Sequence, residues 1–189
     1  MNRETWLDKA CKRMMPWLER CENALPFEAP LVSVGWPKGH RGRGNAIGQC
    51  WDKKTSGDTK RAHIFIAPNL VEAKDVLSTL LHELIHASVG TACGHRKAFR
   101  KVALELDFRP PMRSTPMGES LAQVIDDVAE DLGPYPHPGL NYTKKVKVGS
   151  RLVKVECIEC GCILRMTQKW IDNPGVPICG CGGHMQWGE

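Results

Sequence analysis

With 189 residues, 42% of them hydrophobic and 25% charged, the chain has the size and composition of one globular domain with a small appendage. No run of 18 apolar residues is present, and charged residues are scattered through the first 21 positions, so we expect neither a membrane-spanning helix nor a secretory signal. A cytoplasmic protein without a membrane partner is therefore expected. The net charge of +5 permits nucleic acid as a partner without establishing it, and the sequence is silent on oligomeric state.

In chain order, the first predicted element is an amphipathic helix over residues 4–23, with apolar side chains at spacings of three and four. Short strands are predicted over residues 31–36, 47–51 and 61–67, and we expect them to form a small antiparallel sheet with hairpin connections. Further helices are predicted over residues 71–89, 95–108 and 119–132. These elements indicate an α+β fold in which a small antiparallel sheet packs on helices.

The predicted helix over residues 71–89 carries the pattern HExxH, formed by His82, Glu83 and His86. Residues four apart project from one face of a helix, so the two imidazoles can share one metal ion. In such sites zinc lowers the pKa of its water to about 7, and the glutamate takes the proton of that water. The alternative is a chance match in an unrelated helix.

A catalytic zinc site normally has three protein ligands, so a third is needed. Metzincins place a histidine six residues after the second, but Ala92 occupies that position. His95 lies nine residues after His86, and Gly90 and Gly94 would let the chain bend back toward the metal. Glu105, on the following predicted helix, is the weaker alternative.

Five of the nine cysteines lie within residues 157–181. The pattern Cys157-x-x-Cys160 followed by Cys179-x-Cys181 predicts one structural zinc held by four thiolates, with Cys162 and His184 as alternatives to Cys181. Little core is available there, so metal binding would supply much of the folding free energy. Trp170 and Trp187 are expected to pack against this small domain rather than to stack on bases.

The stretches HELIHASVGTACGHRKAF and, before it, HIFIAPNL resemble the signature of SprT-like zinc metallopeptidases, and the short chain is most similar to compact phage or bacterial members. VECIECGCILRMTQKW and GVPICGCGGHM resemble the zinc ribbon of that family. The resemblance implies a zincin-like protease domain in which His82, His86 and His95 bind the catalytic zinc and Glu83 is the base. Arg96 departs from the family, which often has glycine there.

This interpretation divides the chain into a SprT-like zinc metalloprotease domain over residues 1–133, a basic linker rich in proline and glycine over residues 134–150, and a Cys₄ zinc ribbon over residues 151–189. We expect two zinc ions, one catalytic and one structural, and a zinc-dependent endopeptidase that acts on protein substrates.

Two basic stretches, residues 38–61 and 144–154, carry seven and five lysine or arginine residues. Together with the ribbon they suggest contact with DNA, and SprT-like relatives include proteases that act on DNA-bound proteins; ordinary solvated surface is the other reading. The main alternative function is a nucleic-acid-binding zinc-ribbon protein whose HExxH site is weak or silent. Another class of zinc hydrolase is a second alternative.

Overall fold

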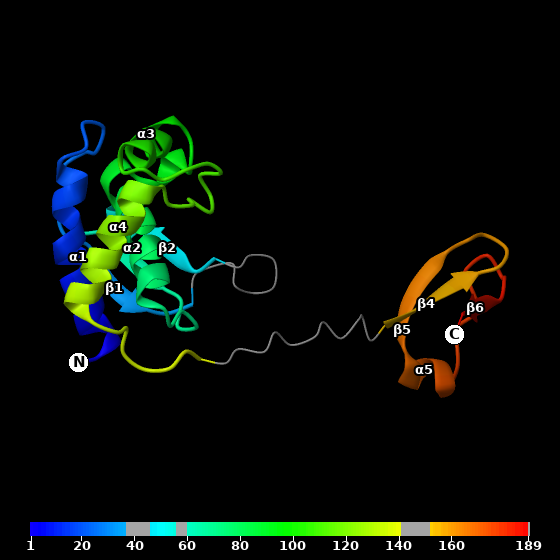
Figure 1. Ribbon diagram of the computed structural model, residues 1–189. Helices are drawn as coiled ribbons and strands as arrows, with labels where there is room; N and C mark the ends of the chain where they lie inside the picture. Colours follow the sequence, from blue (N-terminus) through cyan, green and yellow to red (C-terminus); the bar gives the residue numbers. More distant parts are fainter. Residues whose placement is uncertain (37–45, 56–59, 141–151, 189) are drawn as a thin grey trace. The chain divides into compact units, whose positions relative to one another are not determined.

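The computed structural model describes residues 1–36, 46–55, 60–140 and 152–188 (Figure 1). The chain divides into a first unit, residues 1–142, and a second unit, residues 143–189, each of which we describe by itself. Most of the predicted linker and parts of both basic stretches lie outside the described residues, namely 37–45, 56–59 and 141–151. The predicted domain boundaries therefore stay predictions.

The described residues form an α+β protein with five α-helices and two three-stranded sheets. The first unit contains the helices α1 (Arg3–Glu19), α2 (Ala73–Val89), α3 (Lys97–Glu105) and α4 (Glu119–Leu132), and the strands β1 (Leu31–Val34), β2 (Gly48–Trp51) and β3 (His63–Ile66). Short 3₁₀ turns occupy Lys53–Thr55 and Thr91–Cys93. None of the described helices is both long and apolar enough to cross a bilayer.

The sheet of the first unit is mixed, so the prediction of an antiparallel sheet is confirmed for β2 and β3 but is wrong for β1. Its order is β1-β3-β2, with β2 antiparallel to β3 but β1 parallel to it. The parallel register sets Val32 beside Ile64 and Val34 beside Ile66. Because paired residues share one face of a sheet, this register directs all four apolar side chains into the same core.

Helix α2 is the centre of the first unit, and it packs against α1, α3, α4 and the strands β2 and β3 (Figure 1). Its apolar residues occur on more than one side, which is typical of a helix surrounded by other elements. Six of them are at most 2% exposed: Val76, Leu77, Leu80, Leu81, Leu84 and Ile85. A helix fixed on this many sides gives its polar side chains a rigid support.

Helix α1 ties the end of the first unit to its beginning. Arg3 is buried, and its guanidinium donates hydrogen bonds to the backbone carbonyls of Pro68, Leu70, Pro136, His137 and Pro138. Trp6 donates to the carbonyl of Gly133 at 3.2 Å and meets the Tyr135 ring edge-on at 5.0 Å. The start of the predicted linker therefore packs on the first unit.

The second unit is a small antiparallel sheet with one short helix. Strand β4 (Leu152–Cys157) lies between β5 (Ile163–Thr167) and β6 (Met185–Trp187), and α5 (Gln168–Asp172) follows β5. Among residues 152–188, its buried core consists of four residues, Val155, Cys157, Ile171 and Met185.

Candidate metal centres

The bend predicted after α2 is present and brings three histidines together. Helix α2 ends at Val89, and Gly90 and Gly94 take positive φ angles of 84° and 52° on either side of the turn at Thr91–Cys93. Only glycine adopts such angles without strain. The chain thereby reverses, so that His95, just before α3, faces His82 and His86 across the bend.

The three imidazoles converge through the same ring nitrogen. The Nε2 atom of His95 lies 2.9 Å from Nε2 of His82 and 3.3 Å from Nε2 of His86. Nitrogens bound tetrahedrally to one zinc, at about 2.05 Å each, lie about 3.3 Å apart. The three histidines therefore fit a single metal ion of this kind.

The histidines rest on Phe99 of α3, whose ring centroid lies 4.5 to 4.9 Å from each of the three imidazoles. Burial is the largest cause that lowers the pKa of His82 to about 3 and that of His86 to about 4, followed by the neighbouring imidazoles. Burial, then the charge of Arg113, also lowers the pKa of His95. Neutral imidazole is the form that binds a metal.

Glu83 is buried between α2 and the edge strand β2. The backbone N–H of Cys50 hydrogen-bonds its carboxylate, while burial, the larger influence, raises the pKa of the carboxyl group to about 8. A Cβ atom on Gly48 would lie 2.7 Å from Oε1 of Glu83 and 2.6 Å from Cγ2 of Thr79. Gly48 therefore lets the strand approach the helix closely enough to enclose the carboxylate.

The three histidines and Glu83 line one cleft of about 780 Å³. Its walls come from β2, from α2 and from the loop between α3 and α4, which contributes Arg113 and Thr115. Arg113 is exposed. Clefts of roughly 300–1,000 Å³ are the usual size for ligand binding.

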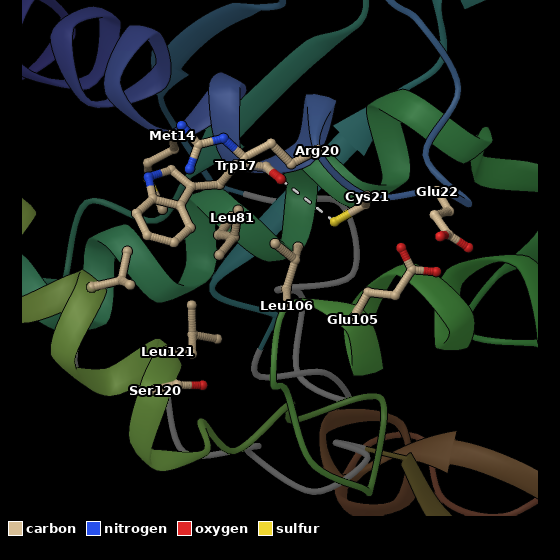
Figure 2. Close-up of a pocket in the computed structure, with 11 residues that line it drawn as sticks. Met14, Trp17, Arg20, Cys21, Glu22, Leu81, Glu105, Leu106, Ser120 and Leu121 are labelled. Atoms are coloured by element: carbon tan, nitrogen blue, oxygen red, sulfur yellow. Dashed lines mark hydrogen bonds between the residues drawn. The ribbon is translucent and has the colours of Figure 1, made fainter.

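Glu105, the alternative third ligand, lies elsewhere. It accepts hydrogen bonds from Asn23 and, with Glu22 and Cys21, borders a different pocket of about 450 Å³ (Figure 2). The apolar side chains of this pocket include Met14 and Trp17 of α1, Leu81 of α2, Leu121 of α4 and Leu106, which directly follows α3. Glu105 does not complete the histidine group.

The second unit brings four cysteines together. The Sγ atoms of Cys157 and Cys181 lie 3.5 Å apart, as do those of Cys160 and Cys179, and all four lie within 4.8 Å of one another. Sulfurs bound to one zinc at about 2.3 Å lie about 3.8 Å apart in a tetrahedron. A backbone hydrogen bond from Cys181, and next the Cys160 thiol, lower the pKa of Cys179 to about 7, whereas the neighbouring thiols raise the pKa of Cys160. The closely spaced thiols thus release their protons one after another, and Cys179 is the first to become a thiolate.

The structure also shows where the alternative ligands Cys162 and His184 and the tryptophans Trp170 and Trp187 lie. Cys162 and His184 are exposed and lie outside the group of four. Trp170 and Trp187 are 54% and 45% exposed and do not belong to the buried core, so their expected packing against the domain is at most partial. A core of four buried residues has no room for two indole rings.

The sequence did not predict three residues that shape the histidine site: Gly48, Arg113 and Thr115. Thr115 lies 3.0 Å from Nδ1 of His82 through its Oγ1 atom. All three lie in loops or an edge strand far from the HExxH pattern, and only the clustering of prolines around residues 110–116 marked that loop as unusual.

Comparison of the chain with protein-family models, with curated proteins and with solved structures found no match.

Proposed function

We propose that this chain is a zinc-dependent endopeptidase of the SprT-like type, with a zincin-like domain followed by a zinc ribbon. One observation carries the proposal: three Nε2 atoms converge within the reach of one ion, and the buried carboxylate of Glu83 lines the same cleft. Three neutral histidines plus an adjacent carboxylate are the donor set and base of a catalytic rather than a structural zinc site.

Each residue has a defined task in this proposal. His82, His86 and His95 would hold the ion, which in such sites supplies a water of pKa about 7. Burial disfavours the carboxylate form of Glu83, whereas the positive charge of a bound ion would favour it. In that form Glu83 would accept a proton from the attacking water and then donate it to the leaving amine. Its close enclosure by Gly48 and Cys50 fixes the carboxylate for both transfers.

The variant Glu83→Gln tests the peptidase proposal. It keeps the shape of the side chain but cannot accept a proton, so cleavage of a denatured protein should fall by about 10²- to 10⁴-fold while zinc content stays the same. Asp75→Asn is the matched control, because Asp75 is an acid of the same helix that lines the same cleft. Cleavage that survives Glu83→Gln would refute the proposal.

Metal stoichiometry tests the two sites together. We expect two zinc ions per chain, and about one after His86→Ala. A chain that still holds two ions after this change would contradict the assignment of the histidine group.

A DNA-binding role for the second unit is the second candidate, favoured by the exposed rings of Trp170 and Trp187. The ammonium of Lys169 lies 5.3 Å from the centroid of the Trp170 ring, so a cation and an aromatic face are presented together. Stacking of a base on an aromatic ring contributes about 1–3 kcal/mol.

This role predicts binding of single-stranded DNA that weakens with salt, measured by fluorescence anisotropy. Trp170→Ala and Trp187→Ala should each weaken it about 5- to 100-fold. Ile178→Ala, which shortens another exposed apolar side chain of the same unit, should change little. Absence of binding at low salt would refute the role.

A further inference from the structure

The loop between α3 and α4 places one hydroxyl group against the histidine centre. Oγ1 of Thr115 lies 3.0 Å from Nδ1 of His82, and both residues are at most 9% exposed. Nδ1 is the nitrogen that does not take part in the convergence of the three rings, because His82 meets His95 through Nε2. Thr115 therefore contacts His82 through the ring nitrogen that faces away from the proposed metal position.

The chemistry of imidazole gives this contact a direction. A neutral ring carries its proton on one nitrogen only, and Nε2 must be unprotonated to bind a metal. With Nε2 free, Nδ1–H donates to Oγ1 of Thr115. A hydrogen bond of this kind fixes both the tautomer and the orientation of a ligand ring.

The loop is built to hold Thr115 in place. The N–H of Arg109 donates to the carbonyl of Pro116 at 2.6 Å, and that of Gly118 donates to the carbonyl of Asp107 at 2.7 Å. Within this frame the N–H of Thr115 donates to the carbonyl of Pro111 at 3.0 Å.

Thr115 itself adopts a φ angle of 38°, which is unfavourable for a β-branched residue. Strain of this type persists only where the surroundings enforce it, and it concentrates at functional sites.

The other two histidines lack an equivalent support. Nδ1 of His86 is buried, and no hydrogen-bond partner for it is found in the described part of the chain. His95 precedes α3 in a turn and is only partly buried. Among the described side chains, Thr115 is thus the one that orients a ring of the centre from behind.

We infer that Thr115 is the positioning residue of the histidine centre: its hydroxyl accepts the Nδ1–H of His82 and holds the tautomer whose Nε2 faces His86 and His95. The inference rests on the proposed metal centre, but not on peptidase activity. If Thr115 only filled space, valine, which has the same shape, would replace it without loss, and the smaller serine would not. If its hydroxyl is what matters, serine should replace it and valine should not.

The test compares Thr115→Val and Thr115→Ser in the full chain loaded with Co²⁺. Affinity is measured by competition with a chelator, and the visible bands of cobalt bound to nitrogen are followed separately from the cobalt–thiolate bands of the four cysteines. Loss of an outer hydrogen bond to a ligand typically weakens metal binding 10- to 100-fold. We expect this loss at the histidine centre for Thr115→Val, with altered nitrogen-site bands, and near-native affinity for Thr115→Ser.

Ser114→Ala is the control, since Ser114 is the exposed neighbour whose hydroxyl donates a hydrogen bond to the Pro111 carbonyl rather than to a histidine. Native affinity in Thr115→Val, or an equal loss in Thr115→Ser, would overturn the inference. A native chain that takes up no Co²⁺ at the histidines would overturn both it and the proposed metal centre. Cleavage that survives Glu83→Gln would overturn the peptidase proposal alone, so the failures can be told apart.

Discussion

The three histidines of the first unit and the four cysteines of the second are surrounded by very different amounts of protein. Counted over the residues that the structure describes, the buried core that includes α2 contains 23 residues, whereas the core beside the cysteines contains four. Burying a leucine or isoleucine side chain contributes about 1.5–3 kcal/mol, so the larger core can hold its helices without a metal. Four residues cannot offset the conformational entropy of a segment of this length.

The difference in core size suggests that the two units depend on a metal ion to different degrees. In the first unit the packed helix holds His82 and His86 on one face through its own core, and an ion bound there would not be needed for folding. In the second unit the ion would draw the two cysteine turns together, and the sheet would form around it. If this difference holds, substitutions in the two units should differ strongly in their cost.

The largest effect is expected for Cys157→Ser. Structural zinc sites contribute about 10–16 kcal/mol of apparent folding free energy, so the second unit should unfold when one ligand is lost. Hydrogen exchange should show loss of protection over residues 152–188 and unchanged protection over residues 73–89. Cys162→Ser is the control, because Cys162 lies outside the group of four. A protected second unit in Cys157→Ser would break the comparison.

The core of the first unit should respond to Leu84→Ala. Leu84 is fully buried in α2, and truncation of such a residue costs about 2–5 kcal/mol in unfolding free energy through lost contacts and a cavity. Denaturant titration measures the change. Leu104→Ala should cost less than about 0.5 kcal/mol, since Leu104 is 45% exposed in α3. Equal costs would show that packing around α2 is not what supports the site.

A third effect is expected at Arg3, which joins α1 to residues 136–138. Arg3→Met keeps a long side chain but leaves several backbone carbonyls without a donor, and hydrogen bonds to a charged group contribute about 1.5–3 kcal/mol. The unfolding free energy should fall by at least the contribution of one such bond. Arg13→Met is the control, because the exposed ion pair of Arg13 with Asp131 contributes at most about 1 kcal/mol. An Arg3→Met loss no larger than that of the control would contradict this role.

Local spacing explains what the sequence predicted well. The helix at residues 119–132 and the convergence of His82, His86 and His95 both follow from short-range rules, namely helical periodicity and glycine at a bend. The meeting of four cysteines follows in the same way from two tight turns joined by a hairpin. In each case the residues concerned fix their own geometry.

What the sequence did not predict depends on contacts between distant residues. The parallel pairing of β1 with β3 is set by the shared core, not by either strand alone. Arg3 meets residues more than 130 positions away, and Thr115 meets a histidine 33 positions away. The exposure of Trp170 and Trp187 reflects how little core the second unit has, which composition does not reveal.

The smallest predicted change in stability concerns Gly48, where the first unit encloses Glu83. In Gly48→Ala the new Cβ would meet Cγ2 of Thr79 and Oε1 of Glu83, so strand and helix must separate slightly, at a cost of about 1–2 kcal/mol. Adding Thr79→Ser removes Cγ2 while keeping the hydroxyl that donates to the carbonyl of Asp75 at 2.7 Å. The double variant should therefore recover part of the lost unfolding free energy, which a double-mutant cycle measures directly. If the losses in unfolding free energy of the two single variants simply add, the strand and helix must move apart easily at Gly48. The site of the first unit would then be less rigid than its large core implies.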